Sequence, residues 1–118
     1  MTSGLGRIGV CSWSLRPASP AELAERAAAT GVAGVQLALE PLLLGEWSER
    51  DTLAALDGAG LPLLSGMLAM RGEDYSSIAA IRRTGGLRPT EHWPANLESA
   101  RRAAGLARRL ELTLVSFH

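Results

Sequence analysis

The chain has 118 residues, 47% of them hydrophobic and 20% charged, and its formal net charge at pH 7 is zero. This composition is ordinary for a soluble globular protein, and the zero charge gives no electrostatic basis for binding nucleic acid or an anionic membrane. All twelve basic side chains are arginine and Cys11 is the single cysteine, which excludes, within this sequence, a Schiff-base lysine, a disulfide framework and a multi-cysteine zinc site.

The first predicted strand is the apolar run Arg7–Ser12, and Trp13 follows it directly. The first helix is then marked by Ser19, which precedes a proline and stands three residues before a glutamate. That pattern combines a capping box with proline at the first helical position. We expect this helix to end at Gly31, because glycine readily takes the left-handed conformation found at helix C-termini.

A second strand is predicted at Gly34–Glu40, without clean alternation of apolar and polar residues, as expected for a strand covered on both faces. A second helix is predicted to begin at Ser48, with acidic residues in its first turn, and to end at the glycines Gly58 and Gly60. The third strand is predicted at Leu61–Ala69, where a proline is tolerable only near the start.

A long segment, Met70–Trp93, follows the third strand and contains one short helical turn, predicted at Ile78–Arg83. Pro94 then opens a helix with apolar residues at helical spacing. This helix leads into a fourth strand, predicted at Leu112–His118. Loops as long as Met70–Trp93 are usually lids, binding segments or disordered tracts.

Strands that alternate with helices predict a parallel sheet with right-handed crossovers, in the strand order 1-2-3-4, with three main helices on its outer face. A parallel sheet must be covered on both faces or closed into a barrel. The chain is much shorter than the roughly 250 residues of an eight-stranded α/β barrel. We therefore interpret residues 1–118 as a single partial domain of the α/β class, the front half of an enzyme.

Four segments together resemble the sugar phosphate isomerase/epimerase family of the xylose isomerase-like barrel superfamily, which also includes endonuclease four. They are IGVCSWSL, GVAGVQLALEP, GLPLLSGMLAMRGEDY and LTLVSFH. The resemblance spans nearly the whole chain. It implies the N-terminal half of a (β/α)8 TIM barrel that binds Mn, Mg, Co or Zn and moves protons between adjacent carbons of a ketose-like substrate.

The resemblance also implies that the catalytic glutamates and most metal ligands lie in the second half of the barrel, which this sequence does not contain. The catalytic residues are therefore unknown from this chain. We expect the 118 residues alone to bind no metal and to be inactive toward ketoses and sugar phosphates, because proton transfer between carbons needs two positioned groups.

Chemistry in such folds gathers at the carboxyl ends of the strands, which makes Trp13, Glu40 and His118 the candidate substrate-binding residues. The alternative for Trp13 is simple packing under a loop. For Glu40 it is a solvated carboxylate or an arginine partner. The resemblance to the endonuclease branch also implies His118 as a metal ligand, against the alternatives of pocket lining or a disordered terminal residue, and one imidazole cannot hold a metal alone.

Arginines in the long loop offer a second interpretation. Arg71, Arg82, Arg83 and Arg88 can clamp a phosphate or carboxylate bidentately. We instead favour a solvated surface network of these arginines with the neighbouring acidic residues, which include Glu73.

The sequence leaves two other functions open. A DNA-repair enzyme of the endonuclease type is disfavoured by the zero charge and the absence of lysine. A non-catalytic half-barrel, in contrast, would pair with a second copy through its open sheet edges. With no apolar run of membrane-spanning length and no signal-peptide core, we expect a cytoplasmic protein with a small sugar as partner and neither nucleic acid nor membrane.

Overall fold

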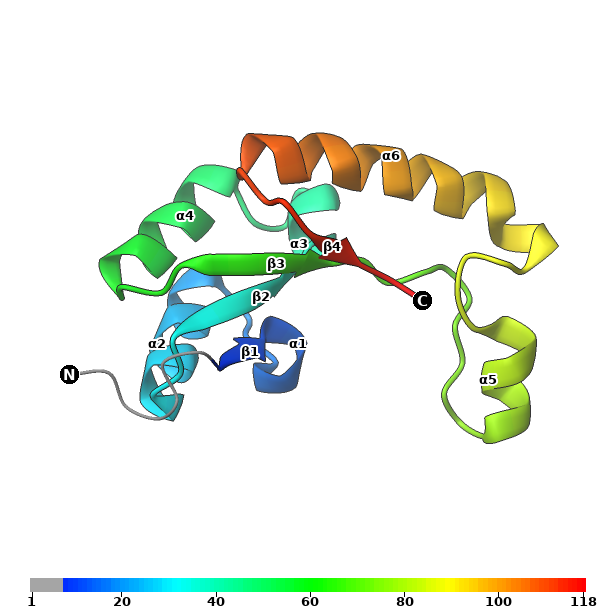
Figure 1. Ribbon diagram of the computed structural model, residues 1–118, viewed down its shortest axis with the longest axis horizontal. Coiled ribbons are helices and arrows are strands. Elements are labelled where there is room, and N and C mark those ends of the chain that lie inside the picture. Colours follow the sequence, from blue (N-terminus) through cyan, green and yellow to red (C-terminus); the bar gives the residue numbers. More distant parts are fainter. Residues whose placement is uncertain (1–7) are drawn as a thin grey trace.

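The parallel sheet predicted from the sequence is present. The computed structural model describes residues 8–118, which form an α/β fold with a four-stranded parallel sheet and six α-helices (Figure 1). The strands pair in the order β1-β2-β3-β4, which confirms the predicted order. Their bounds are β1 (Gly9–Cys11), β2 (Gly34–Ala38), β3 (Leu63–Met67) and β4 (Val115–Ser116).

Three long helices correspond to the three main helices predicted, and α5 corresponds to the predicted helical turn. The short helices α1 and α3, each directly after a strand, were not predicted. The helices are α1 (Ser12–Leu15), α2 (Pro20–Thr30), α3 (Glu40–Leu43), α4 (Glu49–Gly58), α5 (Ile78–Thr84) and α6 (Trp93–Arg109), and a 3-10 turn spans Thr90–His92. Figure 1 shows α6 lying along the sheet and α5 standing beyond the carboxyl end of β3.

The predicted helix caps form. The Ser19 hydroxyl accepts a hydrogen bond from the amide of Glu22 at 3.1 Å, and Gly31 ends α2 with a φ of 73°. The Ser48 hydroxyl accepts from the Asp51 amide at 3.0 Å. These caps satisfy amides that a helix start leaves without intrahelical partners.

All four strands are shorter than predicted, β1, β3 and β4 at both ends and β2 at its carboxyl end alone, since β2 begins at Gly34 as predicted. Arg7, at the start of the predicted first strand, lies outside the described residues. At the other end of β1 and β2, Ser12 and Glu40 begin helices rather than ending strands. For Glu40 the physical reason is Pro41, whose fixed φ suits the first turn of a helix.

The third and fourth strands are shortened by competing hydrogen bonds. The amide of Leu61 bonds the carbonyl of Leu56 at the end of α4, and Pro62 has no amide to give to the sheet. The amide of Leu112 bonds Ala107 at the end of α6, so the strand begins only after that helix has been completed. In the described chain, β4 pairs with β3 alone.

The hydrophobic core lies between the sheet and the long helices. Its largest fully buried apolar side chains come from α2, β2 and α6 and the residue after β2: Leu23, Val35, Leu37, Leu39 and Leu106. Because side chains alternate along a strand, the other face of the sheet carries residues such as Gln36. On that face the Gln36 amide donates to the Ser116 hydroxyl at 3.1 Å.

The face opposite the core is open. Leu64 is 47% exposed and Leu114 is 60% exposed. Leu64 lies over Gly9 and Gly34, which pair across β1 and β2. A Cβ at either glycine would come within 2.7 Å of the Leu64 side chain, so the absence of side chains there leaves room for this leucine.

Candidate functional site at the carboxyl edge of the sheet

The register of the sheet brings two of the predicted site residues to the same level. Ala38, Met67 and Ser116 form one row across β2, β3 and β4. Glu40 and His118 each follow this row by two residues. Both therefore lie just beyond the carboxyl edge of the sheet, where parallel α/β folds gather their functional groups.

Trp13 lies on α1, two residues after the end of β1. Since Cys11 pairs with Gln36, Trp13 follows β1 at the level of Ala38, two residues before Glu40. The indole is on an exposed residue, with 43% of its surface accessible. The described contacts do not join Trp13 to Glu40 or His118, so the structure does not bring the three predicted residues into one contact group.

Glu40 links the ends of β2 and β3. One carboxylate oxygen accepts a hydrogen bond from the amide of Ala69, and the other is buried without a hydrogen-bond partner among the described residues. Arg71 and Arg102 lie with Glu40 around a pocket of about 260 Å³. The alternative of a solvated carboxylate is therefore wrong, because this carboxylate braces the edge and keeps one acceptor oxygen free.

His118 belongs to a hydrogen-bonded group with Glu73 and Tyr75, which we call the Glu73 cluster. The Tyr75 hydroxyl lies 2.7 Å from Glu73 Oε2 and 2.8 Å from His118 Nδ1, and His118 Nδ1 lies 3.1 Å from the same Oε2. The backbone of His118 is also held, since its carbonyl accepts from the Leu87 amide at 3.0 Å. His118 is thus held by its side chain and its backbone within this hydrogen-bonded group.

Glu73 is the buried centre of this cluster. Its side chain is only 6% exposed, whereas that of His118 is 52% exposed. The Met70 amide donates to Oε1 at 2.9 Å and the Gly86 amide donates to Oε2 at 3.1 Å. The prediction that Glu73 belongs to a solvated arginine network is wrong, because its partners are backbone amides and the other two side chains of the cluster.

The hydrogen bonds to Glu73 keep it ionised. Burial alone would raise its pKa, but the bonds from Tyr75, Met70, Gly86 and His118 outweigh burial, and the pKa lies below its ordinary value. The pKa of Tyr75 is raised to about 12 by burial, by its hydrogen bond to Glu73 and by the negative charge there. At neutral pH the cluster thus contains a carboxylate and a neutral phenol.

His118 was predicted as a site residue from the sequence, whereas Glu73 and Tyr75 were not. Both lie in the loop after the third strand, which was marked as a functional region. The available signal was their position a few residues beyond that strand in the segment RGEDY. The missing information was the distant part of the chain that buries Glu73.

The residues of this edge do not fit the divalent metal that the family resemblance implies. Within residues 8–118, no group of three histidine, cysteine, aspartate or glutamate side chains is placed to hold a metal ion. His118 Nδ1 is already engaged by Glu73 and Tyr75.

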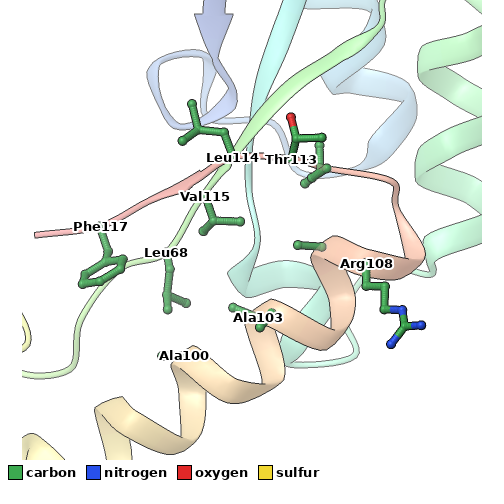
Figure 2. A pocket seen from close by; sticks show the side chains of 11 residues that line it. Leu68, Ala100, Ala103, Arg108, Thr113, Leu114, Val115 and Phe117 are labelled. Carbon is green, nitrogen blue, oxygen red and sulfur yellow. The ribbon is translucent and has the colours of Figure 1, made fainter.

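A separate apolar pocket of about 450 Å³ lies between β4 and α6. Figure 2 shows Leu68, Val115 and Phe117 on one side, facing Ala100 and Ala103 of α6. It carries no carboxylate or imidazole and lies on the helix-covered side of the strand. It is therefore unsuited to the polar chemistry of the carboxyl edge.

The structure is therefore an α/β chain with polar side chains, Glu40 and the Glu73 cluster, at the carboxyl ends of its parallel strands. A comparison with family models, curated proteins and solved structures gave no match to the chain. In the described part of the chain, helices long and apolar enough to cross a membrane are absent.

Proposed function

We propose that this chain is the N-terminal half of a (β/α)8 barrel enzyme, an isomerase or epimerase of a small sugar or sugar phosphate. The observation that carries the proposal is the shared level of Glu40 and His118 beyond the row of Ala38, Met67 and Ser116. In a closed barrel, strand ends at one level converge on a common mouth.

The sheet supports a barrel in two ways. Its strand order is sequential, and each new strand is added at the same edge, as a barrel requires. The face opposite the core leaves Leu64 and Leu114 exposed, as expected for strands whose inner face is completed by further strands.

The polar groups at the edge suit a polyhydroxylated substrate. Glu40 offers a buried carboxylate oxygen without a hydrogen-bond partner in the described chain, and such an acceptor gains from a hydroxyl donor. Trp13 is an exposed residue that follows β1, the strand next to β2. An aromatic face suits the C–H side of a sugar. Neither residue is assigned a proton-transfer role.

The test is proton exchange at carbon in the protein that carries these residues together with the remaining barrel strands. Ketopentoses, ketohexoses and their phosphates would be incubated in deuterated water, and deuterium at the carbons next to the carbonyl would be measured by mass spectrometry. We expect incorporation that falls about ten- to hundredfold in Glu40→Gln, the size of one lost transition-state hydrogen bond of about 1.5 to 3 kcal/mol.

Arg101→Ala is the matched control, since this exposed arginine lies on α6, away from the strand ends. It should retain normal exchange. Equal exchange in Glu40→Gln and Arg101→Ala would show that the edge is scaffold, and no exchange with any ketose would refute the isomerase proposal. The 118-residue chain alone should give no exchange.

A second candidate function is favoured by the open edges of the sheet. β1 and β4 each pair with one neighbour only within the described residues, and unpaired edges invite further pairing. Parallel pairing of β4 with β1 of a second copy is compatible with two-fold symmetry and would close a barrel from two chains. A dimer in sedimentation equilibrium would support this candidate, and a monomer at high concentration would exclude it.

A further inference from the structure

We propose that Glu73 and Tyr75 hold neutral His118 as the tautomer protonated on Nδ1, which presents Nε2 at the carboxyl edge as a hydrogen-bond acceptor for a hydroxyl group. Glu73 is in this account a positioning residue. The ligand class, a hydroxyl-bearing substrate, rests on the proposed function, whereas the tautomer rests on the contacts of the Glu73 cluster alone.

Counting protons gives the tautomer. Three contacts join Glu73 Oε2, the Tyr75 hydroxyl and His118 Nδ1, at 2.7, 2.8 and 3.1 Å. An ionised carboxylate brings no proton, so the only available protons are that of the hydroxyl and one on Nδ1. With the Tyr75 proton directed to Glu73, a proton on Nδ1 can be shared between the phenol oxygen and the carboxylate.

The other neutral tautomer leaves these contacts unsatisfied. If Nδ1 carried a lone pair, the Tyr75 hydroxyl proton would be the only proton among the Tyr75 oxygen, Glu73 Oε2 and His118 Nδ1. One proton cannot satisfy the three contacts between these atoms. Nδ1 would then face the Glu73 carboxylate at 3.1 Å with no proton between them. Two acceptors at such a distance repel each other, and an unmet polar contact in a partly buried site costs about 1–3 kcal/mol.

The backbone holds the carboxylate in the position that this count requires. The amides of Met70 and Gly86 each donate to a different oxygen of Glu73. The neighbouring amide of Leu87 donates to the His118 carbonyl. The backbone of His118 and the Glu73 carboxylate are therefore held by the same short segment after α5, and the ring is held to Tyr75 and Glu73 through Nδ1.

Nε2 is the ring nitrogen that this arrangement leaves for a ligand. The hydrogen bonds of the His118 ring to the described residues are all made by Nδ1, and the side chain is 52% exposed. In the Nδ1-protonated neutral ring, Nε2 is an acceptor and not a donor. The edge thus favours a hydroxyl over a carbonyl or phosphate oxygen at this position.

The test is nitrogen-15 NMR of the whole 118-residue chain, at a pH where the imidazole is neutral. The chain has two histidines, and a His92→Gln variant assigns their signals. We expect the His118 Nδ1 shift of a protonated ring nitrogen and the Nε2 shift of an unprotonated one. A protonated Nε2 in the native chain, or an equal mixture of tautomers, would overturn the proposal.

Variants of the Glu73 cluster distinguish a residue that sets the tautomer of His118 from one that only stabilises the fold. Glu73→Ala, which removes the carboxylate acceptor for the Nδ1 proton and frees the Tyr75 hydroxyl to donate to Nδ1, should shift His118 toward the Nε2-protonated form. Tyr75→Phe should keep the Nδ1-protonated form, because the direct Glu73 contact remains. Asp74→Asn is the matched control, since this exposed neighbour bonds Ser76 and not His118, and it should leave the tautomer unchanged.

An unchanged tautomer in a folded Glu73→Ala chain would refute the positioning role, and circular dichroism would establish whether that variant folds. If it does not fold, Tyr75→Phe and the native chain still decide the matter. Since no substrate is present, failure of this test leaves the isomerase proposal standing, and failure of the deuterium assay leaves the tautomer standing.

Discussion

Replacing Ser12 by alanine should destabilise the protein although only one oxygen atom is removed. Ser12 is 3% exposed, and its hydroxyl accepts a hydrogen bond of 2.8 Å from the amide of Ala38. This bond ties the first residue of α1 to the last residue of β2. Without it, a buried amide is left with no partner, which costs about 1–3 kcal/mol.

Urea denaturation followed by circular dichroism measures this cost. With a slope of about 1–3 kcal/mol per molar urea for a chain of this size, the midpoint should fall by on the order of 1 M while the slope stays the same. Ser14→Ala is the matched control on the same helix, because Ser14 is exposed. If both variants unfold at the same urea concentration, water or a rearranged backbone satisfies the Ala38 amide, and the reasoning from burial fails.

Three further changes test other parts of the structure. Leu106→Ala should lower the free energy of unfolding by about 2–5 kcal/mol, because this side chain is 1% exposed in the core; a loss under 1 kcal/mol in chemical denaturation would mean that the core refills the space. Gly86→Ala should displace His118, because the φ of Gly86 is 80° and a Cβ there would lie 2.9 Å from the His118 carbonyl carbon; unchanged His118 ring signals in NMR would contradict this. Tyr75 is the single tyrosine, so ultraviolet titration should show its phenol ionising at about 12, and Glu73→Gln should move that pKa down toward the ordinary 10.0; a native midpoint near 10 would argue against the hydrogen bond.

Local signals in the sequence were enough to predict the three long helices, the short helix α5 and the order of the strands, but not α1 and α3. Ser19 and Ser48 act within three residues of themselves, so the helix starts that they cap could be located from the sequence alone. The strand ends could not, because they depend on partners elsewhere. Glu40 reads as the end of a strand in isolation, but the last pair of β2 with β3 is Ala38 with Met67.

The candidate site could also be predicted only in part. Glu40 and His118 could be placed at the carboxyl edge because strand ends in a parallel sheet meet there. The burial of Glu73 could not be foreseen, since it depends on the amide of Gly86, 13 positions away, and on His118, 45 positions away. Whether the chain is half of a barrel stays a prediction.

The hydrogen bonds of His118 have a consequence for the folding pathway. They close loops of 43 and 45 residues, back to Tyr75 and Glu73, and such contacts form only after the entropy of loop closure has been lost. The Glu73 cluster should therefore be absent from the folding transition state. Substitutions in it should accelerate unfolding and leave the folding rate nearly unchanged, so the polar edge would be the last part of the sheet to form and the first to open.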